Sequence, residues 1–176
     1  MKRILLAGFG GQGILFAGKF LAYLGLMRGQ EVSWLPSYGP EMRGGTANCS
    51  VILSDGRIGS PIVDTPDILI CMNLPSLDKF EQSVVPGGQL YTDSALIPRE
   101  TTREDIQAFA IPATQIASDH QMTKLANMIL LGKVMRESGI CTRDEAEQVI
   151  KKLVPEKKQD LIAVNMQAID FGLNCP

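Results

Sequence analysis

The sequence predicts an α/β fold: a Rossmann-like three-layer sandwich with a mostly parallel sheet, an antiparallel excursion at the sheet edge, and C-terminal helices. The chain opens with an apolar run at residues 4–7, followed by a glycine-rich turn and a second apolar run of helical length. Short apolar runs then alternate with helical segments, which is typical of a parallel sheet. The 176 residues, 45% hydrophobic and 20% charged, suit one globular domain with a substantial core.

The turn after the first predicted strand reads Gly8-Phe9-Gly10-Gly11-Gln12-Gly13. Its G-x-G-x-x-G spacing permits a positive backbone angle, close approach of a bound group, and close packing of helix on strand. The following helix directs its unpaired N–H groups and the positive end of its dipole at whatever lies over the loop. The turn therefore predicts either a contact with a phosphate, a cofactor or a partner carbonyl, or a turn that only permits packing.

The first helix, predicted over residues 14–27, is apolar nearly all round and contains Lys19 as its one charged residue. Such a helix needs cover from its own domain or from a partner subunit. We therefore expect the isolated chain to self-associate unless a second helix layer covers this helix.

A second strand, predicted over residues 31–35, should run parallel to the first through a right-handed crossover. In a nicotinamide-binding unit, an acidic residue at the carboxyl end of this strand binds the ribose hydroxyls. Here that end reads Pro36-Ser37, and Glu31 lies at the opposite end. The glycine turn is therefore expected to hold something other than NAD.

The loop after this strand combines an aromatic ring, a carboxylate and a guanidinium in Tyr38, Glu41 and Arg43. Between and after them lie Gly39, Pro40, Gly44 and Gly45. Stiff backbone points together with polar side chains are typical of a recognition loop rather than a simple connection.

The remaining elements follow from periodicity and turn residues. A strand over 47–53, a turn at 54–57 and a return at 58–61 predict the antiparallel excursion at the edge. Further strands are predicted over 67–72, 89–93 and 108–112. Helices are predicted from a cap at Ser76, over 118–139, over 142–154 after the capping box of Thr142 and Glu145, and over 159–171. Asn127 lies within the apolar stretch of the predicted long helix. Its side-chain amide needs a hydrogen-bond partner, which would lie either in a loop or at an interface.

Charge and composition exclude several functions. A net charge of −2 and an isoelectric point near 5.4 do not suit a nucleic-acid scaffold. The four cysteines form no C-x-x-C pair, and the sequence contains a single histidine, so no metal site is predicted. The residues are Cys49, Cys71, Cys141, Cys175 and His120. No signal peptide and no membrane span are evident, which predicts a cytoplasmic protein.

The glycine turn and the loop at 37–45 together resemble the gamma subunit of 2-oxoacid:ferredoxin oxidoreductases, the family that acts on pyruvate, 2-oxoglutarate and 2-oxoisovalerate. The similarity extends through residues 73–80 and 124–128, so it covers nearly the whole chain. Residues 1–176 are identified as a single gamma domain, similar to catalytic domain III of the fused enzymes. The chain looks like the separate gamma subunit of the 2-oxoglutarate or branched-chain type.

The resemblance implies a shared reaction, in which a 2-oxoacid is oxidatively decarboxylated with coenzyme A to an acyl-CoA, carbon dioxide and reduced ferredoxin. It also implies partners: alpha and beta subunits that hold thiamine diphosphate with Mg2+ between them, and [4Fe-4S] clusters on beta or on a ferredoxin-like delta subunit. This chain itself is expected to bind no cofactor alone, and to contain no catalytic residue and no metal ligand.

The two loops are expected to meet at the carboxyl edge of the sheet, to dock on the thiamine-binding subunits and to shape the approach of coenzyme A or substrate. The residues expected to make these contacts are Gly8, Gly10, Gly11, Gln12, Gly13, Tyr38, Gly39, Pro40, Glu41, Arg43, Gly44 and Gly45. The alternatives are a free-standing nucleotide-binding enzyme and a purely architectural subunit. Within the family, pyruvate or an aromatic 2-oxoacid of the indolepyruvate type stays open as the substrate.

Overall fold

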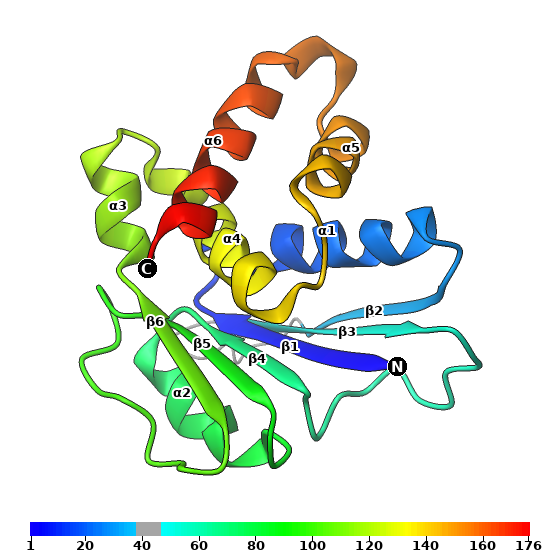
Figure 1. Cartoon of the computed structure of the whole chain (residues 1–176), viewed down its shortest axis with the longest axis vertical. Helices are drawn as coiled ribbons and strands as arrows, with labels where there is room; N and C mark the ends of the chain where they lie inside the picture. Colours follow the sequence, from blue (N-terminus) through cyan, green and yellow to red (C-terminus); the bar gives the residue numbers. More distant parts are fainter. Residues whose placement is uncertain (38–46) are drawn as a thin grey trace.

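The computed structural model describes residues 1–37 and 47–176, and in these the chain forms one mixed six-stranded sheet with helices on both faces (Figure 1). The strands are β1 (Lys2–Gly8), β2 (Glu31–Ser37), β3 (Ala47–Ser54), β4 (Ile68–Cys71), β5 (Gln89–Asp93) and β6 (Gln107–Ile111). The helices are α1 (Ile14–Met27), α2 (Leu74–Phe80), α3 (Ala113–Asp119), α4 (Ala126–Ser138), α5 (Arg143–Leu153) and α6 (Asp160–Asn174). The short 3₁₀ turns are η2 (Glu81–Ser83), η3 (Thr123–Leu125) and η4 (Glu156–Lys158).

The strand order is β2-β3-β1-β4-β5-β6. Strands β1, β4, β5 and β6 are mutually parallel. Strand β3 is antiparallel to both of its neighbours, β1 and β2. β2 therefore runs in the direction of β1, as expected, but it is not the neighbour of β1. The antiparallel strand also lies one position in from the edge, which β2 occupies. Seven register pairs join β3 to β1, and β3 is buried at nearly every position, so a central place removes more apolar surface from water than the edge would.

The expected return strand at residues 58–61 does not form. Residues 59–61 are exposed, and it is Ile58 and, beyond the segment, Val63 that pack with the apolar residues of the lower face. That face is also covered by α2, while α1, α3, α4, α5 and α6 cover the other face (Figure 1).

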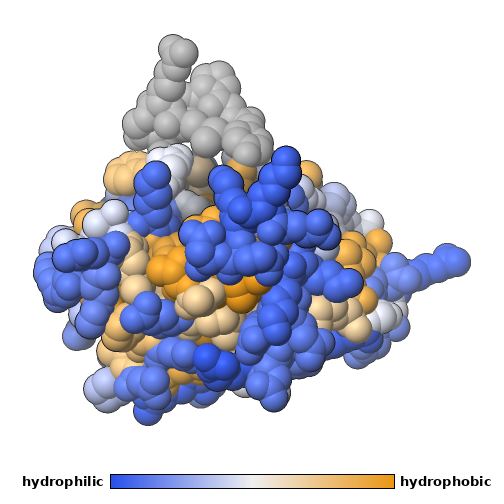
Figure 2. All heavy atoms as spheres, turned by 90° about the horizontal axis from the view of Figure 1, so that it is seen from above, coloured by the Kyte–Doolittle hydropathy of each residue, from blue (hydrophilic) through white to orange (hydrophobic). Residues whose placement is uncertain are grey.

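The larger apolar core lies between the sheet and the helices of the upper face. Within it, α1 is covered by the sheet on one side and by α4 and α5 on the other. The second helix layer thus comes from this chain, although Leu26 stays 58% exposed. The outer face of this layer presents mainly hydrophilic side chains with smaller hydrophobic areas between them (Figure 2).

Two predicted helices have different boundaries. α2 begins at Leu74 because Asn73 is its N-cap, with its side chain accepting a hydrogen bond from the Ser76 amide at 3.0 Å. Ser76 is therefore buried in the first turn and is not the cap. The long helix expected over 118–139 is two helices, because Gln121 adopts a positive φ of 57° that ends helical hydrogen bonding.

His120 consequently ends α3 rather than opening a long helix, and its ring stacks on Phe171 with centroids 4.0 Å apart. The other local predictions are confirmed: α1 spans 14–27, β5 spans 89–93, and α5 begins with the reciprocal capping box of Thr142 and Glu145.

Candidate functional site

The glycine loop lies at the carboxyl edge of the parallel strands, where β1 ends. From there α1 leads over the upper face toward β2, whereas α2 leads from β4 over the lower face toward β5 (Figure 1). The chain thus leaves the neighbouring strands β1 and β4 in opposite directions. A crevice opens between two such strands, and ligands of open α/β sheets bind there.

The side chain of Gln12 spans this crevice. Its Oε1 accepts a hydrogen bond from the Phe9 amide at 2.6 Å, and its Nε2 donates one to the Met72 carbonyl at 3.0 Å. The Gln12 amide closes the turn by donating to the Phe9 carbonyl at 3.3 Å. The loop is therefore tied to the end of β4, and both the Gln12 side chain and the Phe9 N–H are used within the chain. That Gln12 also contacts a cofactor stays a prediction.

The glycines are required for different reasons. A Cβ on Gly8 would lie 2.6 Å from Gln12 Oε1 and 3.0 Å from Ile14 Cδ1, so Gly8 is needed for packing. Gly11 has a φ of +89° and no described residue near its Cβ position, so a glycine is needed there for its conformation. Gly13 combines a φ of +77° with a Cβ position 2.8 Å from Asn127 Cγ. Gly11 is therefore the one of these three against which another molecule can pack closely.

Asn127 is the residue that holds the other end of the loop. It is 5% exposed, and its Nδ2 donates a hydrogen bond to the Gly13 carbonyl at 3.0 Å. The expectation that this amide brackets a loop is confirmed. Its Oδ1 is buried and has no hydrogen-bond partner among the described residues.

Two hollows flank the loop. One, of about 320 Å³, lies over the start of α1 and is lined by Phe9, Gly10, Gly11, Gly13, Ile14, Leu15, Phe16 and Ala47. Among the described residues no side chain caps α1, so the N–H groups of its first turn suit an anion or a carbonyl. The other, of about 180 Å³, lies on the far side of Gly11 and Gln12 and includes the exposed cation of Lys124.

The predicted recognition residues Tyr38, Gly39, Pro40, Glu41, Arg43, Gly44 and Gly45 lie outside the described residues. The residues that border this segment are described. Ala47 pairs with Gly8, and Ser37 pairs with Asn48. Both ends of the segment therefore lie at the same sheet edge as the glycine loop.

The sheet order also bears on nucleotide binding. β3 separates the end of β2 from β1, and the described part of β2 ends without a carboxylate. Glu31 lies at the amino end of β2, far along the strand from the glycine loop. The arrangement that holds a ribose in dinucleotide-binding folds is therefore not present in the described residues.

The cysteines do not form a reactive centre. All four are free thiols, and burial raises the pKa of Cys49 and of Cys141 to about 12. Burial raises the pKa of Cys71 further still. In the described part of the chain, no group of three His, Cys, Asp or Glu side chains could hold a metal ion, and no helix could cross a membrane.

Sequence reasoning did not find the partners of Gln12 or the charged neighbour Lys124. Gln12 bonds a main-chain carbonyl sixty residues away, which no side-chain pattern encodes. Lys124 reaches the loop because η3 and α4 begin beside it. Its one signal in the sequence was its place in a segment that matched the resemblance.

Comparison with known proteins places this geometry in a family. The sequence matches the family described as pyruvate ferredoxin/flavodoxin oxidoreductase over residues 3–175. It is 40% identical to the ketoisovalerate oxidoreductase subunit VorA of Methanothermobacter marburgensis over 97% of this chain and 35% of that protein. It is 36% identical to the 2-oxoglutarate synthase subunit KorC of Methanocaldococcus jannaschii over 90% of this chain and 87% of that protein. The chain thus spans about a third of the length of the VorA proteins it matches.

Two solved structures with a similar fold also come from 2-oxoacid:ferredoxin oxidoreductases. The gamma subunit of a keto/oxoacid ferredoxin oxidoreductase from Geobacter sulfurreducens is 28% identical, with a TM-score of 0.82 over 98% of this chain and 96% of that one. The 2-oxoglutarate:ferredoxin oxidoreductase of Magnetococcus marinus, solved with 2-oxoglutarate, coenzyme A and succinyl-CoA bound, is 26% identical, with a TM-score of 0.85 over 98% of this chain and 31% of that one. The chain therefore belongs to the pyruvate ferredoxin/flavodoxin oxidoreductase family.

Proposed function

We propose that this chain is the gamma subunit of a multisubunit 2-oxoacid:ferredoxin oxidoreductase. The complex would oxidatively decarboxylate a 2-oxoacid with coenzyme A to an acyl-CoA, carbon dioxide and reduced ferredoxin. Relatives named for 2-oxoglutarate and for ketoisovalerate both support a 2-oxoacid substrate. We place 2-oxoglutarate first, with 2-oxoisovalerate, pyruvate and indolepyruvate as the substrates against which it is compared.

The observation that carries the proposal is the glycine loop, held closed at the carboxyl edge of the sheet beside a helix N-terminus that no described side chain caps. Gln12 and Asn127 fix both ends of the loop, so little conformational entropy is lost when a partner packs on it. Phe9, 43% exposed beside this loop, supplies apolar contact area. A rigid surface of this kind suits docking against the subunits that hold thiamine diphosphate.

The same edge would help to orient coenzyme A. The N–H groups at the start of α1 suit phosphate oxygens or an amide carbonyl of that molecule, and the hollow of about 320 Å³ leaves room for part of it. Thiamine diphosphate would supply the decarboxylation chemistry and iron–sulfur clusters would take up the electrons, both held by the partner subunits. The residues of this chain bind, orient and exclude water, and none of them is proposed as catalytic.

The proposal extends to the second loop. Gly8 and Ala47 are paired, so the ends of the segment that contains Tyr38, Glu41 and Arg43 are fixed beside the glycine loop. We propose that these three side chains make directional contacts with the partner subunits or with coenzyme A. An ion pair to Arg43 at such an interface would be partly desolvated and therefore stronger than a surface pair.

The test replaces Gly11 by Ala in the complete complex. Gly11 has a positive φ, so Gly11→Ala meets no clash with the described residues and costs only the backbone strain, about 1 kcal/mol. Gly29→Ala is the matched control, because Gly29 has a φ of +71°, equally open space, and a place after α1 at the far end of the helix. We expect Gly11→Ala to lower assembly or to raise the KM for coenzyme A by about tenfold, and Gly29→Ala to change neither.

Equal behaviour of the two variants would refute docking at the glycine loop. Arg43→Ala tests the second loop in the same assays, and unchanged assembly with unchanged turnover would remove Arg43 from the proposal. Loss of assembly with an unchanged KM for coenzyme A in the assembled fraction would indicate a purely architectural subunit. A chain that purifies without thiamine-binding and cluster-bearing subunits would refute the gamma-subunit assignment.

A further inference from the structure

The strand β6 forms the open edge of the sheet opposite β2. The Gln107 amide donates to the Gly88 carbonyl at 2.9 Å, and the Ser94 amide donates to the Ile111 carbonyl at 3.0 Å. In a parallel pair, alternate residues direct both backbone groups at the neighbouring strand. Gln107 and Ile111 thus direct theirs at β5, and Ala108 and Ala110 direct their N–H and C=O groups outward.

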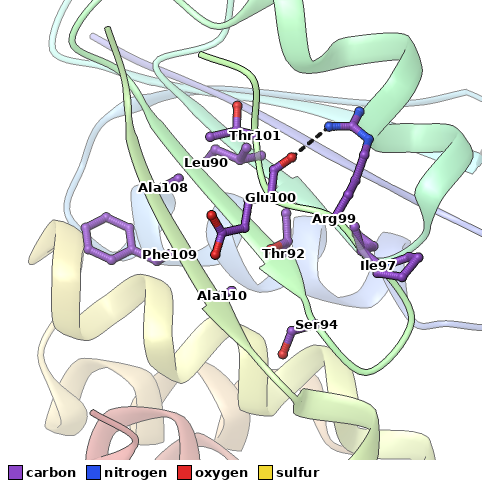
Figure 3. A pocket seen from close by; sticks show the side chains of 11 residues that line it. Leu90, Thr92, Ser94, Ile97, Arg99, Glu100, Thr101, Ala108, Phe109 and Ala110 are labelled. Atoms are coloured by element: carbon purple, nitrogen blue, oxygen red, sulfur yellow. Dashed lines mark hydrogen bonds between the residues drawn. The ribbon is translucent and has the colours of Figure 1, made fainter. Parts of the chain in front are cut away.

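These two alanines also line a hollow of about 490 Å³ beside the edge (Figure 3). Leu90 and Thr92 of β5 extend its floor, while Phe109 points away on the other face of the sheet (Figure 3). The small side chains leave the hollow open directly beneath the unpaired backbone groups. A strand added at this edge would place alternate side chains into such a space.

The opposite wall of the hollow is preformed. Glu81, 4% exposed, accepts hydrogen bonds from Arg99 Nη2 at 2.9 Å, from Thr101 Oγ1 at 2.6 Å and from the Thr102 amide at 2.7 Å. Arg99 also donates to the Glu100 carbonyl at 2.9 Å (Figure 3). The segment that crosses in front of β6 is therefore held in place without a partner.

The two edges of the sheet are protected differently. β2 contains Pro36, and it begins with the exposed carboxylate of Glu31. Proline and charge are the features that keep an edge strand from pairing with another chain. β6 reads Gln-Ala-Phe-Ala-Ile and contains neither. An edge of this composition is suited to being covered by another strand.

Charge selects the occupant. The Glu100 carboxylate extends over the hollow (Figure 3) and has no hydrogen bond or ion pair to any described residue, whereas Arg99 is paired with Asp78 and Glu81. A second copy of this edge would bring another Glu100, and like charges oppose that pairing. A lysine or arginine would instead complete a pair with Glu100.

We propose that β6 accepts an extended segment of a partner subunit as an additional strand. The segment pairs with the backbone groups of Ala108 and Ala110, places apolar side chains in the hollow, and directs a lysine or arginine at Glu100. This inference rests on the proposed function, because the partner is another subunit of the complex. It adds an interface at the opposite side of the sheet from β2, apart from the glycine loop.

The test is residue-resolved hydrogen exchange of the isolated chain and of the complete complex. In the isolated chain the Ala108 and Ala110 amides should exchange rapidly, and the Phe109 amide, bonded to β5, slowly. In the complex both alanine amides should slow by at least about tenfold, the factor that one added hydrogen bond supplies. Rapid exchange at both alanines in a complete complex would overturn the inference and leave the proposed function standing. A chain that does not assemble at all would overturn both.

Charge reversal gives an independent measurement. Glu100→Lys should reduce the amount of partner subunits that copurify by about tenfold, the effect of like charges in place of a pair. Glu104→Lys is the matched control, because Glu104 is an exposed carboxylate of the same segment that does not line the hollow. Equal copurification of the two variants would overturn the assignment. Slow exchange of Ala108 and Ala110 that depends on the concentration of the isolated chain would indicate a second copy as the occupant and would also overturn it.

Discussion

The contact between Gly13 and Asn127 makes a quantitative prediction about how the glycine loop is held. In Gly13→Ala, a methyl group is placed at a φ of +77°, which costs about 1–2 kcal/mol. The new Cβ would also lie 2.8 Å from Asn127 Cγ, so the amide must move and the hydrogen bond to the Gly13 carbonyl is lost. That loss, with a buried amide left unpaired, adds about 2–3 kcal/mol. We expect Gly13→Ala to lower the free energy of unfolding by about 3–5 kcal/mol.

Asn127→Ala should cost less, about 1–2 kcal/mol. The Gly13 carbonyl still accepts a hydrogen bond from the Ala17 amide at 3.0 Å, so it is not left unpaired, and the partnerless Oδ1 is removed. In the double variant the clash is absent and only the backbone strain is added. The losses in unfolding free energy of Gly13→Ala and Asn127→Ala, added together, should therefore exceed the loss of the double variant by about 2 kcal/mol.

The assay is urea unfolding followed by circular dichroism, with linear extrapolation for the unaltered chain, the two single variants and the double variant. Gly11→Ala serves as the control, because Gly11 has a φ of +89° and no atom of a described residue lies within 4 Å of the added Cβ. It reports the strain alone. Losses from Gly13→Ala and Asn127→Ala that add to within about 0.5 kcal/mol would refute the reasoning that the amide and the glycine share one space.

The remaining predictions concern helix packing, pH and thiols. Gly132→Ala should destabilise the chain by more than about 3 kcal/mol in the same assay, because its Cβ would lie 3.0 Å from the Gly172 Cα where α4 crosses α6; a loss below about 1 kcal/mol would contradict this close crossing. The Arg28 side chain lowers the pKa of Glu145 from its usual 4.5 to about 2, so the stability this pair contributes is complete above about pH 4.5 and is lost as the pH falls toward 2. Glu145→Gln should flatten that part of the stability profile, and an unchanged profile would contradict it. One thiol, Cys175, should react quickly with a thiol reagent in the native chain, because the other three are buried; rapid reaction of a second would contradict the core packing.

Local features of the fold were predictable because their causes are local. The apolar run and flanking glycines of α1, the capping box of α5 and the turn before β5 each fix their own boundaries. The place of β3 was not predictable in this way. Its neighbours are chosen by how much apolar surface each register buries, and that depends on the whole sheet. The break between α3 and α4 depends on the positive φ of Gln121, a residue with no strong preference for that conformation.

In the candidate site, too, local features were predictable and contacts that depend on the whole fold were not. The G-x-G-x-x-G spacing predicted a tight loop between a strand and a helix, and the loop is there. The spacing could not predict that the side-chain amide of Gln12 would donate a hydrogen bond to the Met72 carbonyl, because that contact depends on β4 lying beside β1. Asn127 was identified as a bracket from its polarity within an apolar helix, but its partner emerges only from the crossing of α4 near the start of α1.

The sheet order of this chain differs from that of a dinucleotide-binding fold at the strands beside the glycine loop. With β3 placed between β1 and β2, the strand that would supply a ribose-binding carboxylate is displaced from the loop. The same insertion brings the ends of the segment between Ser37 and Ala47 to the carboxyl edge, since Ala47 pairs with Gly8. This strand order thus separates β2 from the glycine loop and places Ala47, which borders the segment 38–46, beside Gly8 at the start of that loop. Gln12 bridges the crevice between β1 and β4 by its hydrogen bonds to Phe9 and Met72, so the glycine loop is held closed there, a shape suited to a partner surface.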